Sequence, residues 1–129
     1  MSEAAVIHTP GGVRTWPVPD VSATSLPDGS TVDVWEYGAP DGRPVFAFHG
    51  VPSCGAGFDW ADDPARERGL RLLAPDRPGI GRSSGPPLSS IADHPARVAA
   101  LADALGLDRF AVLGYSGGGP YAVACASLL

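Results

Sequence analysis

The sequence contains no lysine, no asparagine and no glutamine, so its nine basic residues are all arginines. Without lysine, the chain has neither a Walker A phosphate-binding loop nor a residue able to form a lysine Schiff base. Without asparagine or glutamine, it has no N-glycosylation acceptor and no side-chain amide that could stabilise an oxyanion. These absences exclude a Walker A nucleotide-binding site, catalysis through a lysine Schiff base and an oxyanion hole built from side-chain amides.

Positive charge and cysteine are also scarce. Fourteen acidic residues against nine arginines give a formal net charge of −5, which argues against nucleic-acid binding because phosphate contacts need clustered cations. Cys54 and Cys125 are too few for a disulfide framework or a zinc site, and we expect both to be buried. No apolar run approaches the roughly 20 residues of a membrane span, and residues 1–14 do not resemble a signal peptide. We therefore expect a cytoplasmic protein that binds neither nucleic acid nor membrane.

What the sequence does contain is an alternation of short apolar runs and helical patterns after residue 20. Residues 1–20, rich in proline and glycine, are expected to form an irregular arm. Strands are predicted at 21–26, 31–37, 45–48, 71–74 and 110–113, and helices between 63 and 69, at 95–105 and at 117–129. The first two strands would form an antiparallel hairpin. The rest predicts an α/β fold with a mostly parallel, twisted sheet and helices on both faces.

The segment Gly114-Tyr115-Ser116-Gly117-Gly118 follows one of these apolar strands and opens a helix. This is the Gly-x-Ser-x-Gly pattern of a nucleophile elbow in the strand-turn-helix context that the pattern requires. The flanking glycines leave room for a sharp, strained turn, and the serine hydroxyl would stand at a helix N-terminus that favours developing negative charge. The simpler alternative is that Ser116 only caps the helix.

Two further segments follow their own strands. His49-Gly50-Val51-Pro52 comes after the strand 45–48, and Asp-Arg-Pro-Gly-Ile-Gly-Arg-Ser occupies 76–83 after the strand 71–74. With the elbow, these three motifs in this order resemble the N-terminal half of the α/β-hydrolase fold family. The chain is similar to bacterial serine hydrolases of the proline iminopeptidase and epoxide hydrolase-like type, over residues 21–129.

The resemblance implies roles for individual residues. Ser116 would be the nucleophile, and the backbone N–H groups of Val51 and Gly117 would form the oxyanion hole. The supporting positions around them would be His49, Gly50, Gly114 and Gly118. A serine nucleophile favours small ester, thioester or amide substrates over dehalogenase or epoxide chemistry, and it needs no cofactor and no metal.

Other candidates are weaker. The pattern Gly117-x-Gly119-x-x-Ala122 matches a dinucleotide fingerprint, but no acidic residue lies about 20 positions downstream. We expect His94 to be a solvated residue at a helix start. Arg77 could clamp an anionic substrate, although an ion pair with a nearby aspartate is the expected role, and Asp76 resembles a residue that braces its loop.

The thirteen residues after Ser116 include neither an acid nor a histidine, although the family order places both triad partners downstream of the serine. We therefore expect a chain truncated after the elbow helix and weak or inactive by itself. The strand 110–113 would then be an open sheet edge, available for self-association or for a missing C-terminal half. The alternative function is a non-catalytic, hydrolase-like module that binds a ligand or a partner.

Overall fold

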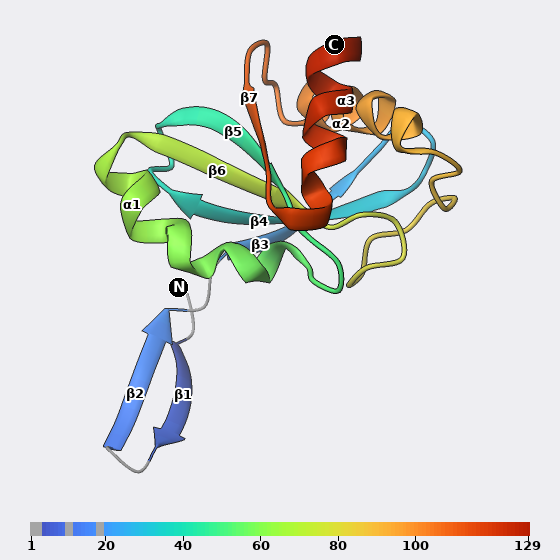
Figure 1. The fold of residues 1–129 in the computed structure, drawn as a ribbon. Coiled ribbons are helices and arrows are strands. Elements are labelled where there is room, and N and C mark those ends of the chain that lie inside the picture. Colours follow the sequence, from blue (N-terminus) through green and yellow to red (C-terminus); the bar gives the residue numbers. More distant parts are fainter. Residues whose placement is uncertain (1–3, 10–11, 18–19) are drawn as a thin grey trace.

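A five-stranded mixed sheet organises the chain in the computed structural model, which describes residues 4–9, 12–17 and 20–129 (Figure 1). Its strand order is β3-β4-β6-β5-β7. The strands are β3 (Asp20–Ser25), β4 (Thr31–Gly38), β5 (Arg43–Phe48), β6 (Leu70–Pro75) and β7 (Ala111–Gly114). Because β4 is antiparallel to β3 and β6, and β5 is parallel to β6 and β7, all strands of this sheet except β4 point the same way. The predicted sheet and its antiparallel hairpin are confirmed.

Helices cover both faces of this sheet, as predicted (Figure 1). One face carries the 3₁₀ helix η1 (Gly55–Ala61) and α1 (Asp62–Glu67), and the other carries α2 (His94–Ala104) and α3 (Gly119–Leu128). Alternate residues of β5 serve the two cores, since side chains along a strand point to opposite faces. Phe46 and Phe48 pack with α2 and α3, whereas Val45 and Ala47 pack with η1 and α1.

The ends of α2 follow from its sequence. Ser90 and Asp93 form a capping box over a 3₁₀ turn, η2 (Ile91–Asp93), which leads into the helix. At the other end Gly106 takes a left-handed φ of +69°, and the N–H of Leu107 donates to the carbonyl of Ala102 at 2.9 Å, which is typical of a helix that ends at a glycine. No helix within the described ranges is long and apolar enough to cross a membrane.

The segment predicted as an irregular arm contains two strands, β1 (Ala4–Thr9) and β2 (Gly12–Pro17), so that prediction is wrong for these residues. The strands pair antiparallel in a sheet of their own, with Thr9 opposite Gly12. The prolines and glycines predict irregular structure for the segment as a whole, whereas the paired stretches themselves contain β-branched and aromatic residue types that favour strands.

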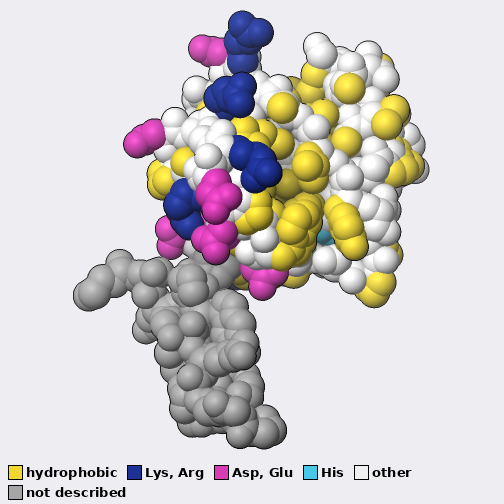
Figure 2. Space-filling view, turned by 60° about the vertical axis from the view of Figure 1, so that its left-hand side comes forward, with side chains coloured by type: hydrophobic (Ala, Val, Ile, Leu, Met, Phe, Trp, Pro, Cys, Tyr) yellow, Lys and Arg dark blue, Asp and Glu magenta, His cyan; other side chains and the backbone are white. Residues whose placement is uncertain are grey.

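The strand β7 forms one edge of the five-stranded sheet, where it pairs with β5 alone among the described strands. Leu113 on β7 and Val123 and Leu128 on α3 are exposed. Figure 2 shows other hydrophobic side chains in the centre of the view, beside a group of charged ones. The cysteines differ in burial: Cys125 is in the core, as expected, but Cys54 is only half-buried, contrary to expectation.

Candidate active site

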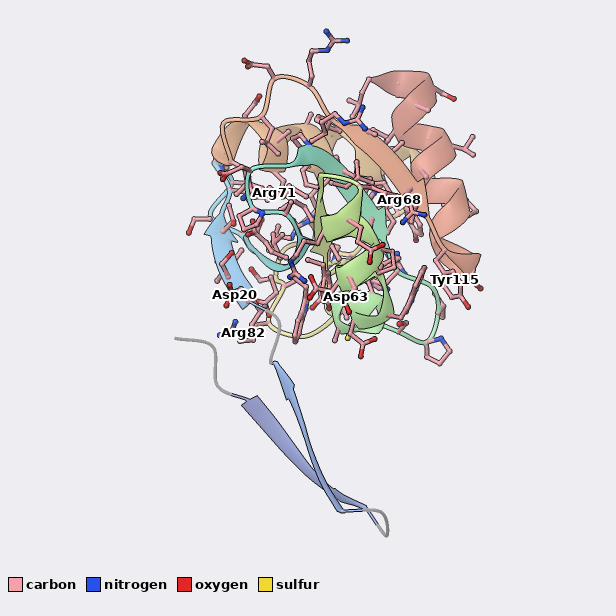
Figure 3. The ribbon with its side chains drawn as sticks, turned by 90° about the vertical axis from the view of Figure 1, so that its left-hand side faces the viewer. Asp20, Asp63, Arg68, Arg71, Arg82 and Tyr115 are labelled. Carbon is pink, nitrogen blue, oxygen red and sulfur yellow. The ribbon has the colours of Figure 1, made fainter. Side chains whose placement is uncertain are left out.

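The loops that follow β5, β6 and β7 meet at the carboxyl ends of these parallel strands. Phe48 ends β5 directly opposite Gly114, which ends β7, and the N–H of Tyr115 donates to the Phe48 carbonyl at 3.1 Å. Tyr115 lies at the turn between β7 and α3 (Figure 3). The parallel register therefore brings the segment after β5, which begins with His49, against the segment that contains Ser116.

The Ser116 turn has the geometry expected of the elbow. Ser116 is exposed and has a φ of +50°, a left-handed conformation that costs a non-glycine residue about 1–3 kcal/mol. It opens the 3₁₀ turn η3 (Ser116–Gly118), which leads directly into α3. A side chain at Gly114 would collide with the carbonyl of Gly118, and one at Gly118 with the carbonyl of Phe48. Both glycines are therefore steric requirements of the turn.

The two predicted oxyanion donors lie next to each other. A Cβ atom built on Gly117 would stand 3.4 Å from the backbone nitrogen of Val51. A Cβ built on Gly50 would stand 3.2 Å from the Cβ of Ser116, so only glycine allows this approach without displacing a neighbour. The structure thus places Val51, Gly117 and Ser116, predicted together from sequence, in one small region.

His49 is buried beneath this region, with 2% of its surface exposed. Its Nε2 accepts the backbone N–H of Arg77 at 3.3 Å, and its Nδ1 lies 2.9 Å from the carbonyl oxygen of Gly50. Burial lowers the pKa of the ring. Both ring nitrogens are engaged by neighbouring groups, because Nη2 of Arg77 also lies 2.9 Å from Nδ1.

Arg77 does not form the expected ion pair with an aspartate. Its Nη1 donates to the carbonyl of His49 at 2.6 Å, its Nη2 donates to that of Gly50 at 3.1 Å, and its guanidinium carbon lies 4.5 Å from the ring centroid of Tyr121 on α3. The Asp76 carboxylate instead accepts hydrogen bonds from the Gly55 N–H at 2.5 Å and from the indole N–H of Trp35. Asp76 therefore braces its loop as expected, while Arg77 joins two other segments.

His94 is buried instead of solvated, because α2 packs this end of the helix against the sheet and α3. Its ring packs edge-on against Phe48 and Tyr121 at centroid distances of 4.7 and 4.8 Å, and its Nδ1 is 3.9 Å from the sulfur of Cys125. Burial, reinforced by nearby arginines, lowers the pKa of His94 to about 4. The sequence does not reveal this burial, because the residues that surround His94 are distant from it in the chain.

No group of three or more histidine, cysteine, aspartate or glutamate side chains that could hold a metal ion occurs among the residues described. The candidate site consists of the strained Ser116, the neighbouring backbone N–H groups of Val51 and Gly117, and the buried polar side chains of His49 and Arg77. Such an arrangement can place a hydroxyl nucleophile beside hydrogen-bond donors that would stabilise negative charge on a carbonyl oxygen.

The chain belongs to the alpha/beta hydrolase fold family, whose model matches residues 43–128. A non-heme chloroperoxidase of Streptomyces lividans is 37% identical over 95 residues, which cover 71% of this chain and 34% of the relative. Two solved structures are similar. An epoxide hydrolase from an endophytic Streptomyces has a TM-score of 0.74 at 27% identity, covering 85% of this chain and 33% of that one. An esterase from Exiguobacterium antarcticum has a TM-score of 0.66 at 25% identity, covering 83% and 40%.

The chain thus has a hydrolase fold, and hydrolases are among its structural neighbours. It spans between about a third and two fifths of the length of these relatives. The residues that the family model matches, 43–128, contain the strands β5, β6 and β7 and the candidate site at their carboxyl ends.

Proposed function

We propose that Ser116 is the nucleophile of a serine hydrolase that cleaves ester, thioester or amide bonds through an acyl-enzyme. The observation that supports this most is the left-handed φ of +50° at an exposed serine on a strand-to-helix turn. A helix cap does not require that conformation, since capping residues are normally extended. Strain held at one exposed polar residue is typical of functional sites.

In the proposed reaction, Ser116 Oγ forms a bond to the substrate carbonyl carbon and its proton passes to a base. The carbonyl oxygen gains negative charge and accepts hydrogen bonds from the N–H groups of Val51 and Gly117. Collapse of this intermediate breaks the bond to the leaving group, which takes up the proton, and water then hydrolyses the resulting ester of Ser116. The presence of an esterase among the structural neighbours supports a carboxylic ester as the substrate class.

The base is a separate requirement. His49 and His94, the histidines whose side chains the structure describes, are both buried and in contact with other groups, so neither is free to activate Ser116. We therefore propose that the 129-residue chain reacts slowly by itself. Oxyanion stabilisation and binding without a functional triad still leave a rate about 10³–10⁴ above that in water.

A fluorophosphonate probe tests the assignment, with the adduct located by peptide mass spectrometry. We expect slow modification confined to Ser116, lost in Ser116→Ala and retained in Ser127→Ala, a matched change at an exposed serine on α3. Modification of another residue, or an unchanged yield in Ser116→Ala, would contradict the proposal. A protein that never reacts but binds a ligand would favour the non-catalytic module instead.

A further inference from the structure

The guanidinium of Arg77 holds two consecutive carbonyl groups of the loop after β5. It donates to His49 O at 2.6 Å and to Gly50 O at 3.1 Å, and its Nη2 also lies 2.9 Å from Nδ1 of His49. The guanidinium is thus packed against the whole His49–Gly50 segment. Arg77 is 8% exposed and His49 is 2% exposed, so water competes little for these bonds.

Gly50 O belongs to the same peptide unit as the N–H of Val51. This unit is planar and trans, so its C=O and N–H groups point in opposite directions. Fixing the carbonyl toward Arg77 therefore fixes the direction of the Val51 N–H, which points away from Arg77 within the same peptide plane. The Val51 nitrogen, which carries this N–H, lies beside Gly117 at the turn that contains Ser116.

We infer that Arg77 is a positioning residue that orients and polarises the Gly50–Val51 peptide for oxyanion binding, an inference that rests on the proposed function of Ser116. Hydrogen bonds from a cation to the carbonyl draw electron density from the peptide and make its N–H a stronger donor. The guanidinium thereby acts on the reacting carbonyl oxygen through a peptide unit and without touching it.

The surroundings of Arg77 suit this role. Within the described chain no carboxylate pairs with its guanidinium, whereas Arg66, Arg71 and Arg82 each pair with an acid. Its charge is supported by the face of Tyr121, which lies on the helix that follows Ser116. Arg77 therefore connects the loop that contains Val51 to the helix that follows the nucleophile.

Arg77→Met should be compared with Arg97→Met. Arg97 is a matched control because it also bridges loops, donating to Ser30 Oγ and to the carbonyls of Thr31 and Ser84, but it does not contact the loop after β5. In the ¹H–¹⁵N spectrum, the Val51 amide should move upfield in Arg77→Met and stay in place in Arg97→Met. A purely structural loss would not single out Val51.

The second readout is the rate of fluorophosphonate modification of Ser116. We expect Arg77→Met to slow it about tenfold or more, less than the 10²–10³ of losing an oxyanion donor outright, with Arg97→Met close to wild type. Should Arg77→Met not fold, Tyr121→Leu leaves the arginine without its aromatic support and should shift the same amide by a smaller amount. An unchanged Val51 amide in whichever of these two variants folds would overturn the inference. Absence of any Ser116 adduct in the wild type would instead overturn the proposed function, while the Val51 amide still decides the role of Arg77.

Discussion

Gly118 lies against the carbonyl oxygen of Phe48 so closely that a Cβ atom at position 118 would overlap it. The contact joins the first turn after Ser116 to the end of β5. It also involves backbone on both sides, which cannot move aside as a flexible side chain can. The elbow and the neighbouring loop are therefore held together by a close approach of main chains.

Replacing Gly118 with alanine should accordingly lower the free energy of unfolding by about 3 kcal/mol, the upper range for overpacking. Gly119→Ala is the matched control, because a Cβ there meets nothing within 4 Å and the residue has a helical φ of −56°. Urea denaturation should show the control unchanged or more stable by up to about 1 kcal/mol. Equal stabilities for the two variants would contradict the steric account.

The buried ring of His94 should make stability depend on pH. Its folded pKa of about 4 lies below the ordinary 6.5, so between these values the unfolded chain binds more protons than the folded one. Stability is therefore complete above pH 6.5 and falls as pH decreases toward 4, by about 3 kcal/mol in all. The cationic neighbours Arg77 and Arg97, with the nearby ring of His49, act in the same direction.

His94→Phe removes this titration while keeping a ring between Phe48 and Tyr121. The wild type should lose stability between pH 6.5 and 4 more steeply than the variant, as measured by urea denaturation at several pH values. Parallel pH profiles for the two proteins would show that His94 is not the group responsible.

Neutralising Asp76 should lower the stability of the fold. Its buried carboxylate accepts the Gly55 N–H and the Trp35 indole N–H, and an asparagine would turn one acceptor into a donor facing a donor. We expect Asp76→Asn to lower the free energy of unfolding by about 2 kcal/mol. The control is Asp63→Asn, since that side chain is 88% exposed and its change should stay within about 0.5 kcal/mol. Equal effects would count against the bracing role.

The open edge at β7 should make the isolated chain self-associate. Leu113 is exposed on this strand, and edge strands with apolar side chains pair readily with other chains. Leu113→Lys should reduce the mass measured by light scattering, whereas Val21→Lys, at the opposite edge strand β3, should not. A monomeric wild type, or a decrease with Val21→Lys alone, would contradict this assignment.

The sequence predicts local structure here better than it predicts side-chain neighbours. The helix α2 has its periodicity, capping residues and glycine stop within one short segment, so its limits differ from the prediction by one residue at each end. The elbow was predictable for the same reason, because residues 114–118 and the strand and helix on either side of them lie in one short segment. The close approach of this turn to Val51 was expected only through the family resemblance.

The contacts of Arg77 and His94 could not be predicted, because they depend on which loops the sheet brings together. Asp76 is adjacent to Arg77 in sequence but bonds to Gly55 and Trp35, while Arg77 reaches the loop after β5. One sequence signal pointed this way: a cation two residues after an apolar strand whose parallel neighbour is followed by His49-Gly50. Residues at the ends of neighbouring parallel strands share one edge of the sheet.

The central claim is that Ser116 forms an acyl-enzyme, and the most direct test is to trap that species. The protein is mixed with an excess of an activated aryl ester, quenched in acid at successive times long enough for the slow reaction proposed above, and measured by intact mass and peptide mapping. We predict a single added acyl group on the peptide that contains Ser116, absent from Ser116→Ala and present in Ser127→Ala. An unmodified Ser116 peptide, or acyl groups distributed over other residues with equal yield in Ser116→Ala, would contradict the account.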